Sequence, residues 1–290
     1  MPSSTATATS HFLDTNGFRV HYQRLGSGST LILLLHGSFL SVRSWRHVTA
    51  ELAQHATVVA IDRPLCGKTS RPVPKTGGAA LYSAEAQSDL VAAVIEQLGF
   101  ERAIVIGHST GGTVSLLTAL RQPERVQALV LVGAMVYSAY ATSKLPAPML
   151  KMMTAAKPLF ARLMRVMIGA FYTKALRALW HRQELLTEAD IAAYRADFMA
   201  KAWDRAFLES FLATKPLGLD TQVPGLTLPT LVITGAHDRA VKPEESERLA
   251  AAVPNAQLVV IPDCGHIPHE EAPAAFLAAV TPFLQQLGNV

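Results

Sequence analysis

Six short runs of apolar, mostly branched residues recur along the chain and limit what it can fold into. They lie at 31–35 (LILLL), 57–61 (TVVAI), 103–107 (AIVIG), 128–132 (ALVLV), 230–235 (TLVITG) and 257–262 (QLVVIP). They lack the polar alternation of a strand with one face in water, so we predict buried parallel strands. Helical patterns separate the runs, and this alternation is typical of an α/β fold wound from βαβ units.

The start of the chain is predicted to hold a leader and an edge hairpin. Residues 1–10 are polar and lack the basic start and apolar core of a secretory signal, so we expect a flexible leader. Residues 17–26 (GFRVHYQRLG) alternate apolar and polar side chains. This predicts an exposed antiparallel strand, paired with a shorter one around His11 to Asp14.

The rhythm of strand and helix stops between 137 and 225, where only helical patterns follow one another. We interpret 137–225 as a helical cap inserted between two strands of one sheet. The core is then predicted to consist of 11–136 and 226–290.

Composition excludes several classes of protein. Half of the residues (50%) are hydrophobic and 17% are charged, as in compact globular proteins. The net charge is +4, but lysines and arginines are dispersed, so no nucleic-acid partner is expected. No apolar run approaches the roughly 20 residues that cross a bilayer. We therefore expect a cytoplasmic protein, with Cys66 and Cys264 as free thiols.

A lone serine among glycines is the first candidate for chemistry. GHSTGG at 107–112 follows a predicted buried strand and precedes a predicted helix, with Ser109 at the turn. A sharp strand-to-helix turn strains the serine backbone, and side chains at the flanking positions would collide with neighbouring elements, which explains the glycines. The start of the helix also favours a developing oxyanion.

A serine hydroxyl needs a base, and that base needs an orienting acid. His266 follows the last predicted strand, and Asp238 follows the strand before it. Like Ser109, both lie at carboxyl ends of strands, the edge where open α/β sheets place their active crevice. Asp263 is a rival acid three residues from His266, but at that separation it is expected to turn the loop, so Asp238 is favoured.

These residues resemble the α/β-hydrolase family, whose serine, acid and histidine follow in this chain order, and the likeness covers nearly the whole chain. Its fold is a mostly parallel sheet flanked by helices, here with a helical cap. HGSFLSVRSW at 36–45 resembles the family's oxyanion loop, which implies that the backbone N–H groups of Ser38 and Thr110 hold the oxyanion, with Phe39 a neighbour able to share that role. DRPLCGKTSRP at 62–72 resembles a structural loop of the family, with Cys66 and Lys68 departing from its pattern.

Other sites are rejected on their residues. CGKTS lacks the first glycine of a phosphate loop, because that position is Asp62, and GHSTGG is not a dinucleotide motif. His36 is expected to bond locally, and His269 lacks the partners of a metal site. No cofactor or metal is expected.

The function expected from the resemblance is hydrolysis of carboxylic esters of small or hydrophobic acyl groups through an acyl-enzyme. Serine at position 109 sets the chain apart from the dehalogenase and epoxide-hydrolase branches, which place aspartate there. A carbon–carbon hydrolase of ring-cleavage dienones uses the same three residues and stays open, as does a non-catalytic receptor. A small-molecule ester is the expected partner, and the oligomeric state is left open.

Five methionines lie between Met149 and Phe171, with leucines and phenylalanines among them and basic residues nearby. Three readings stay open for this stretch. It lines an acyl pocket, packs the cap onto the core, or touches anionic lipid.

Overall fold

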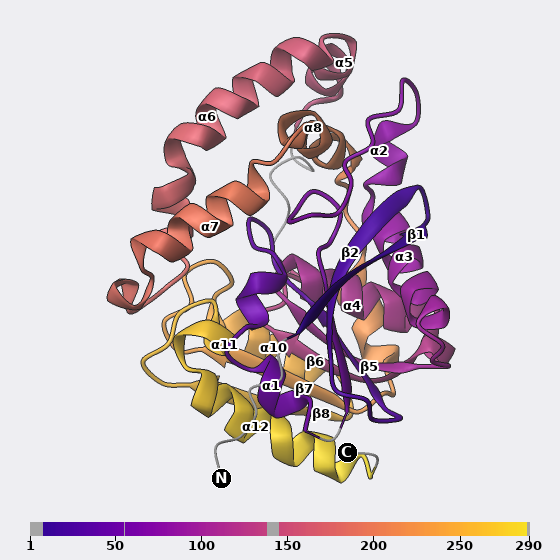
Figure 1. Ribbon diagram of the computed structural model, residues 1–290, viewed down its shortest axis with the longest axis vertical. Coiled ribbons are helices and arrows are strands. Elements are labelled where there is room, and N and C mark those ends of the chain that lie inside the picture. The colour runs from indigo at the N-terminus through magenta and orange to yellow at the C-terminus, as the bar shows by residue number, and fades with distance from the viewer. Residues whose placement is uncertain (1–7, 55, 138–144, 289–290) are drawn as a thin grey trace.

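The computed structural model describes residues 8–54, 56–137 and 145–288, and it places one eight-stranded sheet at the centre (Figure 1). The spatial order of the strands is β1-β2-β4-β3-β5-β6-β7-β8. The strands from β4 to β8 in this order are parallel, whereas β2 runs antiparallel to both β1 and β4. The strands are β1 (Thr9–Thr15), β2 (Phe18–Leu25), β3 (Leu31–Leu35), β4 (Thr57–Ile61), β5 (Ala103–His108), β6 (Val126–Val132), β7 (Thr230–Gly235) and β8 (Ala256–Ile261).

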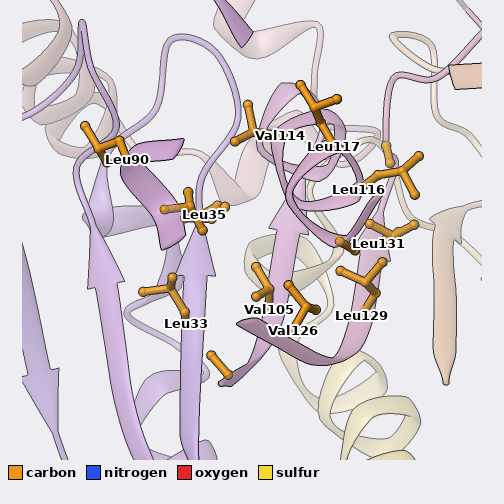
Figure 2. Packing of buried hydrophobic residues seen from close by; sticks show 14 of the residues in the cluster. Leu33, Leu35, Leu90, Val105, Val114, Leu116, Leu117, Val126, Leu129 and Leu131 are labelled. Atoms are coloured by element: carbon orange, nitrogen blue, oxygen red, sulfur yellow. The ribbon is translucent and has the colours of Figure 1, made fainter. Parts of the chain in front are cut away.

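Alternate side chains of the central strands enter two separate cores. Leu33 and Leu35 of β3 point to the side covered by α3 (Ala84–Gln97), α4 (Thr110–Arg121) and α10 (Pro243–Ala252), as Figure 2 shows for α3 and α4. Ile32 and Leu34 point to the side covered by α1 (Thr49–Leu52) and α12 (Pro273–Gln286). Because both faces are covered, these strands carry no polar alternation, which confirms the basis of their prediction.

Two expectations for the strands are corrected. β8 is the edge of the sheet, and Leu258 and Val260 are each 39% exposed, so this run is not a buried strand. Thr9 and Ser10 belong to β1 and pair with β2, so the predicted leader of residues 1–10 extends too far. Its residues 1–7 lie outside the described residues.

Five α-helices lie between β6 and β7 in the described part of the chain, and we call 145–225 the cap. They are α5 (Ala147–Ala155), α6 (Lys157–Arg177), α7 (Glu188–Phe198), α8 (Trp203–Ala213) and α9 (Leu219–Gln222). Tyr172 of α6, Phe198 of α7 and Trp203 of α8 are buried in one cluster, which also contains Leu40 and Ile267 from outside the cap. In the described part of the chain, no helix combines the length and hydropathy needed to cross a membrane.

Shorter elements complete the structure. Between β3 and β4 the chain forms two short helices, because η1 ends at Trp45 and α1 begins at Thr49. The remaining short helices are η1 (Val42–Trp45), α2 (Gly78–Leu81), η2 (Pro123–Arg125), η4 (Gln183–Leu185), η5 (Val223–Gly225) and α11 (Pro268–Glu271).

Candidate active site

Ser109 lies at the turn between β5 and α4 with a backbone that L-residues rarely adopt. Its φ is 53° and its ψ is −121°, and its N–H donates to Val132 O at 2.8 Å. The glycines around it are required sterically, because a Cβ would lie 2.2 Å from Ser115 Oγ at Gly107 and 2.3 Å from Leu35 O at Gly111. The turn therefore holds a strained serine at the amino end of a helix, as the sequence predicts.

His266 and Asp238 are joined by a hydrogen bond. His266 Nδ1–H donates to Asp238 Oδ2 at 2.7 Å, and the two residues are 2% and 5% exposed. Asp238 Oδ1 accepts the N–H groups of Ala240 at 2.8 Å and Val241 at 2.9 Å, which fixes the plane of the carboxylate. With Nδ1 carrying the proton, the Nε2 lone pair of His266 is left available as a base.

The loop that carries His266 is held from several sides. His108, which precedes Ser109, donates through Nε2 to His266 O at 2.9 Å, and His266 N–H donates to Leu179 O of the cap at 2.7 Å. Gly133 at the end of β6 lies against the pair, since a Cβ there would be 3.1 Å from both Asp238 Oδ2 and His266 Nδ1. The loop of His266 thus lies at the carboxyl edge of the sheet, against Asp238, the residue that precedes Ser109 and the cap.

Glu271 joins the histidine loop to the cap. Its carboxylate is buried and accepts three backbone N–H groups, from Gly265 at 2.8 Å, His181 at 3.2 Å and Arg182 at 2.7 Å. The sequence analysis missed this residue, because two of its three partners lie in the cap and nothing in the local pattern marks them.

The two residues expected to hold the oxyanion face each other. Ser38 Oγ and Thr110 Oγ1 are 3.0 Å apart. Thr110 is the first residue of α4. Its backbone N–H has no acceptor within the helix and lies at the positive end of the helix dipole. Arg63 ties the two segments together, with Nη1–H donating to His36 O at 2.9 Å and to Thr110 Oγ1 at 3.0 Å. The sequence analysis did not single out Arg63.

A cavity of about 390 Å³ opens beside these groups. Ser38, Thr110 and Arg63 line one side of it, and Lys215 and Glu85, which form an ion pair of 2.6 Å, line another. The apolar part of its wall consists of Leu65, Tyr82, Val114, Phe207, Phe211 and Leu217. The methionines of the cap are not among its lining residues. Such a cavity fits a small, partly apolar molecule.

The methionine-rich stretch divides between two environments. Met153 and Met164 are buried in a cap cluster with Leu208, so packing accounts for them. Met149, Met152 and Met167 are exposed, at 41%, 53% and 51%.

The rival acid takes another partner. Asp263 Oδ1 lies 3.2 Å from His181 Nε2, and its φ of 51° places it in a turn, as expected for a loop residue. His237 stacks on His181 with ring centroids 3.9 Å apart. Ligand atoms of these three residues lie within 4.8 Å of one another, which is the arrangement among the described residues that comes nearest to a metal site. The guanidinium of Arg182, 3.8 Å from Asp263 Oδ2, disfavours a cation there.

Two other histidines are buried and neutral. His36 donates through Nδ1 to Gly37 O and accepts the N–H of Arg63 at Nε2, the local bonding expected for it. Burial and the nearby Arg63 charge lower the pKa of His36 to about 4. His269 stacks on Trp45 at 4.0 Å, and burial holds its pKa well below the ordinary value.

Asp62 organises the loop that was expected to be structural. It accepts His21 Nδ1–H at 2.6 Å and the N–H groups of Val42 and Lys68, each at 2.8 Å. Burial opposes its charge, but these hydrogen bonds keep the pKa of Asp62 below the ordinary value. Gly67 is required because a Cβ there would lie 1.9 Å from Asp62 Oδ2.

Comparison with known proteins agrees with this fold. A family model described as "alpha/beta hydrolase fold" matches residues 30–273. The chain is 30% identical over 295 residues to a 2-hydroxy-6-oxononadienedioate/2-hydroxy-6-oxononatrienedioate hydrolase of Cupriavidus pinatubonensis, covering 97% of this chain and 96% of the relative. It is 32% identical over 284 residues to a 2-hydroxymuconate semialdehyde hydrolase of Pseudomonas sp. strain CF600, covering 93% and 92%. The crystal structure of a hydrolase from Pseudomonas aeruginosa PA01 superposes with a TM-score of 0.76 at 26% identity, covering 95% of this chain and 98% of that one.

Proposed function

The chain belongs to the alpha/beta hydrolase family, and from this premise we propose that it hydrolyses a carbon–carbon bond beside the ketone of a 2-hydroxy-6-oxodienoate. The observation that carries the proposal is likeness over more than nine-tenths of the chain to hydrolases named for such acids. Ester hydrolysis, expected from the sequence alone, becomes the second candidate.

Ser109, His266 and Asp238 have the roles of nucleophile, base and orienting acid in this proposal. Asp238 holds the Nδ1–H tautomer of His266, so Nε2 takes the proton of Ser109 Oγ as that oxygen adds to the C6 ketone. The N–H groups of Ser38 and Thr110 bind the resulting oxyanion. This role for the two N–H groups is supported by the 3.0 Å contact between the hydroxyls of Ser38 and Thr110, which both line the cavity.

Breaking the carbon–carbon bond needs a place for its electron pair. When the proton of the 2-hydroxyl moves to C5, the substrate becomes an enone with a ketone at C2. The electron pair of the C5–C6 bond can then stay on C5, because it is delocalised through the enone onto the oxygen at C2. Collapse of the intermediate on Ser109 then breaks the bond between C5 and C6. The dienolate fragment takes the proton back from His266 and leaves as a 2-hydroxydienoate, which frees Nε2 again. Water activated by His266 then releases the acid from the acyl-enzyme.

The cavity fits an anionic, conjugated substrate. Its apolar wall, which includes Phe207 and Phe211, suits a planar diene, and Arg63 brings positive charge to it, whereas the charge of Lys215 is balanced by Glu85. Arg63 already donates from Nη1 to Thr110, so a substrate carboxylate near this guanidinium would lie beside the proposed oxyanion groups.

An ester would use the same residues without the proton shift to carbon. The observation that favours this second candidate is the cavity wall, which is apolar apart from a few groups and accepts an acyl chain as readily as a diene.

The test compares both substrate classes on one protein and one variant. Purified wild type and Ser109→Ala are assayed with two substrate classes. Turnover of 2-hydroxy-6-oxodienoates is measured by the loss of the dienol absorbance, and turnover of p-nitrophenyl esters of increasing chain length is measured by the release of p-nitrophenol. We expect the dienoate to give the higher kcat/KM, and Ser109→Ala to lose at least about 10³-fold on either class. Turnover of esters without turnover of dienoates would favour the second candidate. A folded protein that turns over neither would contradict both.

A further inference from the structure

The outer side of the cap exposes a concentration of large apolar side chains. Of the twelve large hydrophobic side chains that are exposed in the described part of the chain, seven lie on α5 and α6. We call these seven the cap stripe: Met149, Met152, Leu159, Leu163, Val166, Met167 and Phe171. Monomeric proteins rarely gather so many large apolar side chains in water on two successive helices, so the cap stripe indicates a binding surface.

The stripe follows one side of α6. At about 100° per residue, its five α6 members fall within an arc of about 140°. The buried residues Ala161, Tyr172 and Leu176 lie on the opposite side, and the buried Met164 lies at the border between the two. From Leu159 to Phe171 the stripe is about 18 Å long. Figure 1 shows α5 and α6 on the outside of the cap, away from the sheet. The inner side of α6 is therefore covered by packing, while its outer side carries the five stripe residues and faces outward.

The charges beside the stripe all have one sign. Residues 147–177 contain six lysines and arginines and no acidic residue. Three of the six pair with acids of other cap segments, namely Lys157 with Glu209, Arg165 with Asp204, and Arg177 with Glu188. For the other three, Lys151, Arg162 and Lys174, the described residues provide no ion pair. Their long side chains can lie along the stripe and project their charges past it.

We propose that the cap stripe docks on the surface of an anionic lipid bilayer, with its apolar residues among the acyl chains and Lys151, Arg162 and Lys174 against the headgroups. A helix with a long apolar face and basic residues at its border has the features of an interfacial helix. The contact is superficial, because no described helix is able to span a membrane. This inference concerns the cap and is independent of the proposed reaction.

Charge distinguishes a bilayer from a second copy of the chain. A symmetric contact between two cap stripes would bring Lys151, Arg162 and Lys174 of one copy to the same patch of the other, where no acid of α5 or α6 is available to pair with them. Anionic headgroups supply the missing negative charge, and lipid chains cover the apolar residues. The bilayer is therefore the occupant that satisfies both parts of the surface.

Docking there would place the membrane close to the cavity. The buried side of α6 packs with α8 through Met164 and Leu208, and α8 contributes Phe207 and Phe211 to the cavity wall. A bilayer at the cap stripe is thus separated from the cavity by the cap helices alone.

The experiment is flotation of the full-length protein with vesicles of phosphatidylcholine alone and of phosphatidylcholine mixed with phosphatidylglycerol, at low and high ionic strength. We expect binding to the anionic vesicles at low salt, and its loss in Leu163→Ser/Phe171→Ser. Lys151→Glu/Lys174→Glu should bind at least about tenfold more weakly, because each basic residue near an anionic surface adds several-fold to binding. Leu258→Ser and Lys242→Glu, which change exposed residues of the core, serve as matched controls and should bind as wild type.

Two results would overturn the proposal. Equal binding by wild type and the Leu163→Ser/Phe171→Ser variant, both folded by circular dichroism, would show that the cap stripe is not the docking surface. Failure of the wild type to bind anionic vesicles would reject lipid. In that case, light scattering that shows a wild-type dimer and a monomeric Phe171→Ser variant would assign the surface to a second copy.

Discussion

His266 Nδ1 donates to Asp238 Oδ2 at 2.7 Å, although Asp263 lies only three residues from His266 in the sequence. Twenty-eight residues of sequence separate the bonded pair, and the sheet brings them together because β7 and β8 are adjacent and parallel. The closer acid points to His181 of the cap instead. The two carboxylates therefore have different partners in the structure. We expect their substitution to have different effects on activity.

We expect Asp238→Asn to lower kcat by about 10⁴-fold on any substrate of Ser109, because an amide partner favours the wrong imidazole tautomer. Asp263→Asn removes the neighbouring carboxylate and is expected to keep kcat within a few-fold. Steady-state kinetics of both variants, with circular dichroism to confirm folding, make the comparison. A larger loss in Asp263→Asn than in Asp238→Asn would reverse the assignment of the acid.

Gly133→Ala should damage the site without changing any polar group. The new Cβ would lie 3.1 Å from Asp238 Oδ2 and His266 Nδ1, on a backbone whose φ is +49°. We expect a loss of stability of about 1–2 kcal/mol from the strained backbone and a fall in kcat of about 10²-fold from displacement of the pair. Thermal denaturation and kinetics measure the two effects.

Gly169→Ala is the matched control for this substitution. Gly169 lies inside α6, and a Cβ there meets nothing within 4 Å. The variant should be as stable as wild type or more stable by up to about 1 kcal/mol, because alanine favours a helix, and its kcat should not change. A Gly133→Ala protein with unchanged kinetics would show that the pair tolerates the displacement.

The places of Ser109, Asp238 and His266 in the fold could be predicted, because each follows a strand whose apolar pattern is local. Parallel strands place their carboxyl ends at one edge, so the sequence predicts which side chains gather there without the strand order. The edge position of β8 was not predictable in this way. QLVVIP is as apolar as the central runs, and the exposure of Leu258 and Val260 depends on the absence of a strand beyond β8 in the sheet order.

Residues that join distant segments were also beyond the sequence. Glu271 accepts N–H groups from residues 89 and 90 positions away, and Arg63 donates to Thr110 across 47 positions. Neither lies in a motif with fixed spacing. Their roles follow from how the cap and the loops meet, which is set by tertiary packing.

Both cysteines should be unreactive in the folded protein. Cys66 and Cys264 are 4% and 0% exposed, and burial raises the pKa of each thiol to about 12. Because the thiolate is the reactive form, a disulfide reagent at pH 8 should modify the native protein far more slowly than the protein in denaturant. Two equivalents should react after unfolding. Rapid modification of the native protein would contradict the burial of these residues.

Three buried histidines should make the fold sensitive to mild acid. Burial lowers the pKa of His36 to about 4 and holds the pKa values of His108 and His269 well below the ordinary 6.5. Below pH 6.5 the unfolded chain binds protons at these positions that the folded chain does not, so the free energy of unfolding falls as the pH drops toward 4. Each histidine contributes up to about 1.4 kcal/mol per pH unit.

His269→Phe isolates one of these contributions. The ring stacks on Trp45 at 4.0 Å, and its two nitrogens have no hydrogen-bond partner in the described part of the chain, so phenylalanine keeps the packing and removes the titrating group. At pH 7 the variant should be as stable as wild type or slightly more stable. Between pH 7 and pH 5 it should lose less free energy of unfolding than wild type, by up to about 2 kcal/mol. Urea denaturation of both proteins at the two pH values measures this difference. The contributions of all other titrating groups cancel, because they are the same in the two proteins. An identical loss in both proteins would mean that His269 takes up its proton in the folded state as readily as in the unfolded chain.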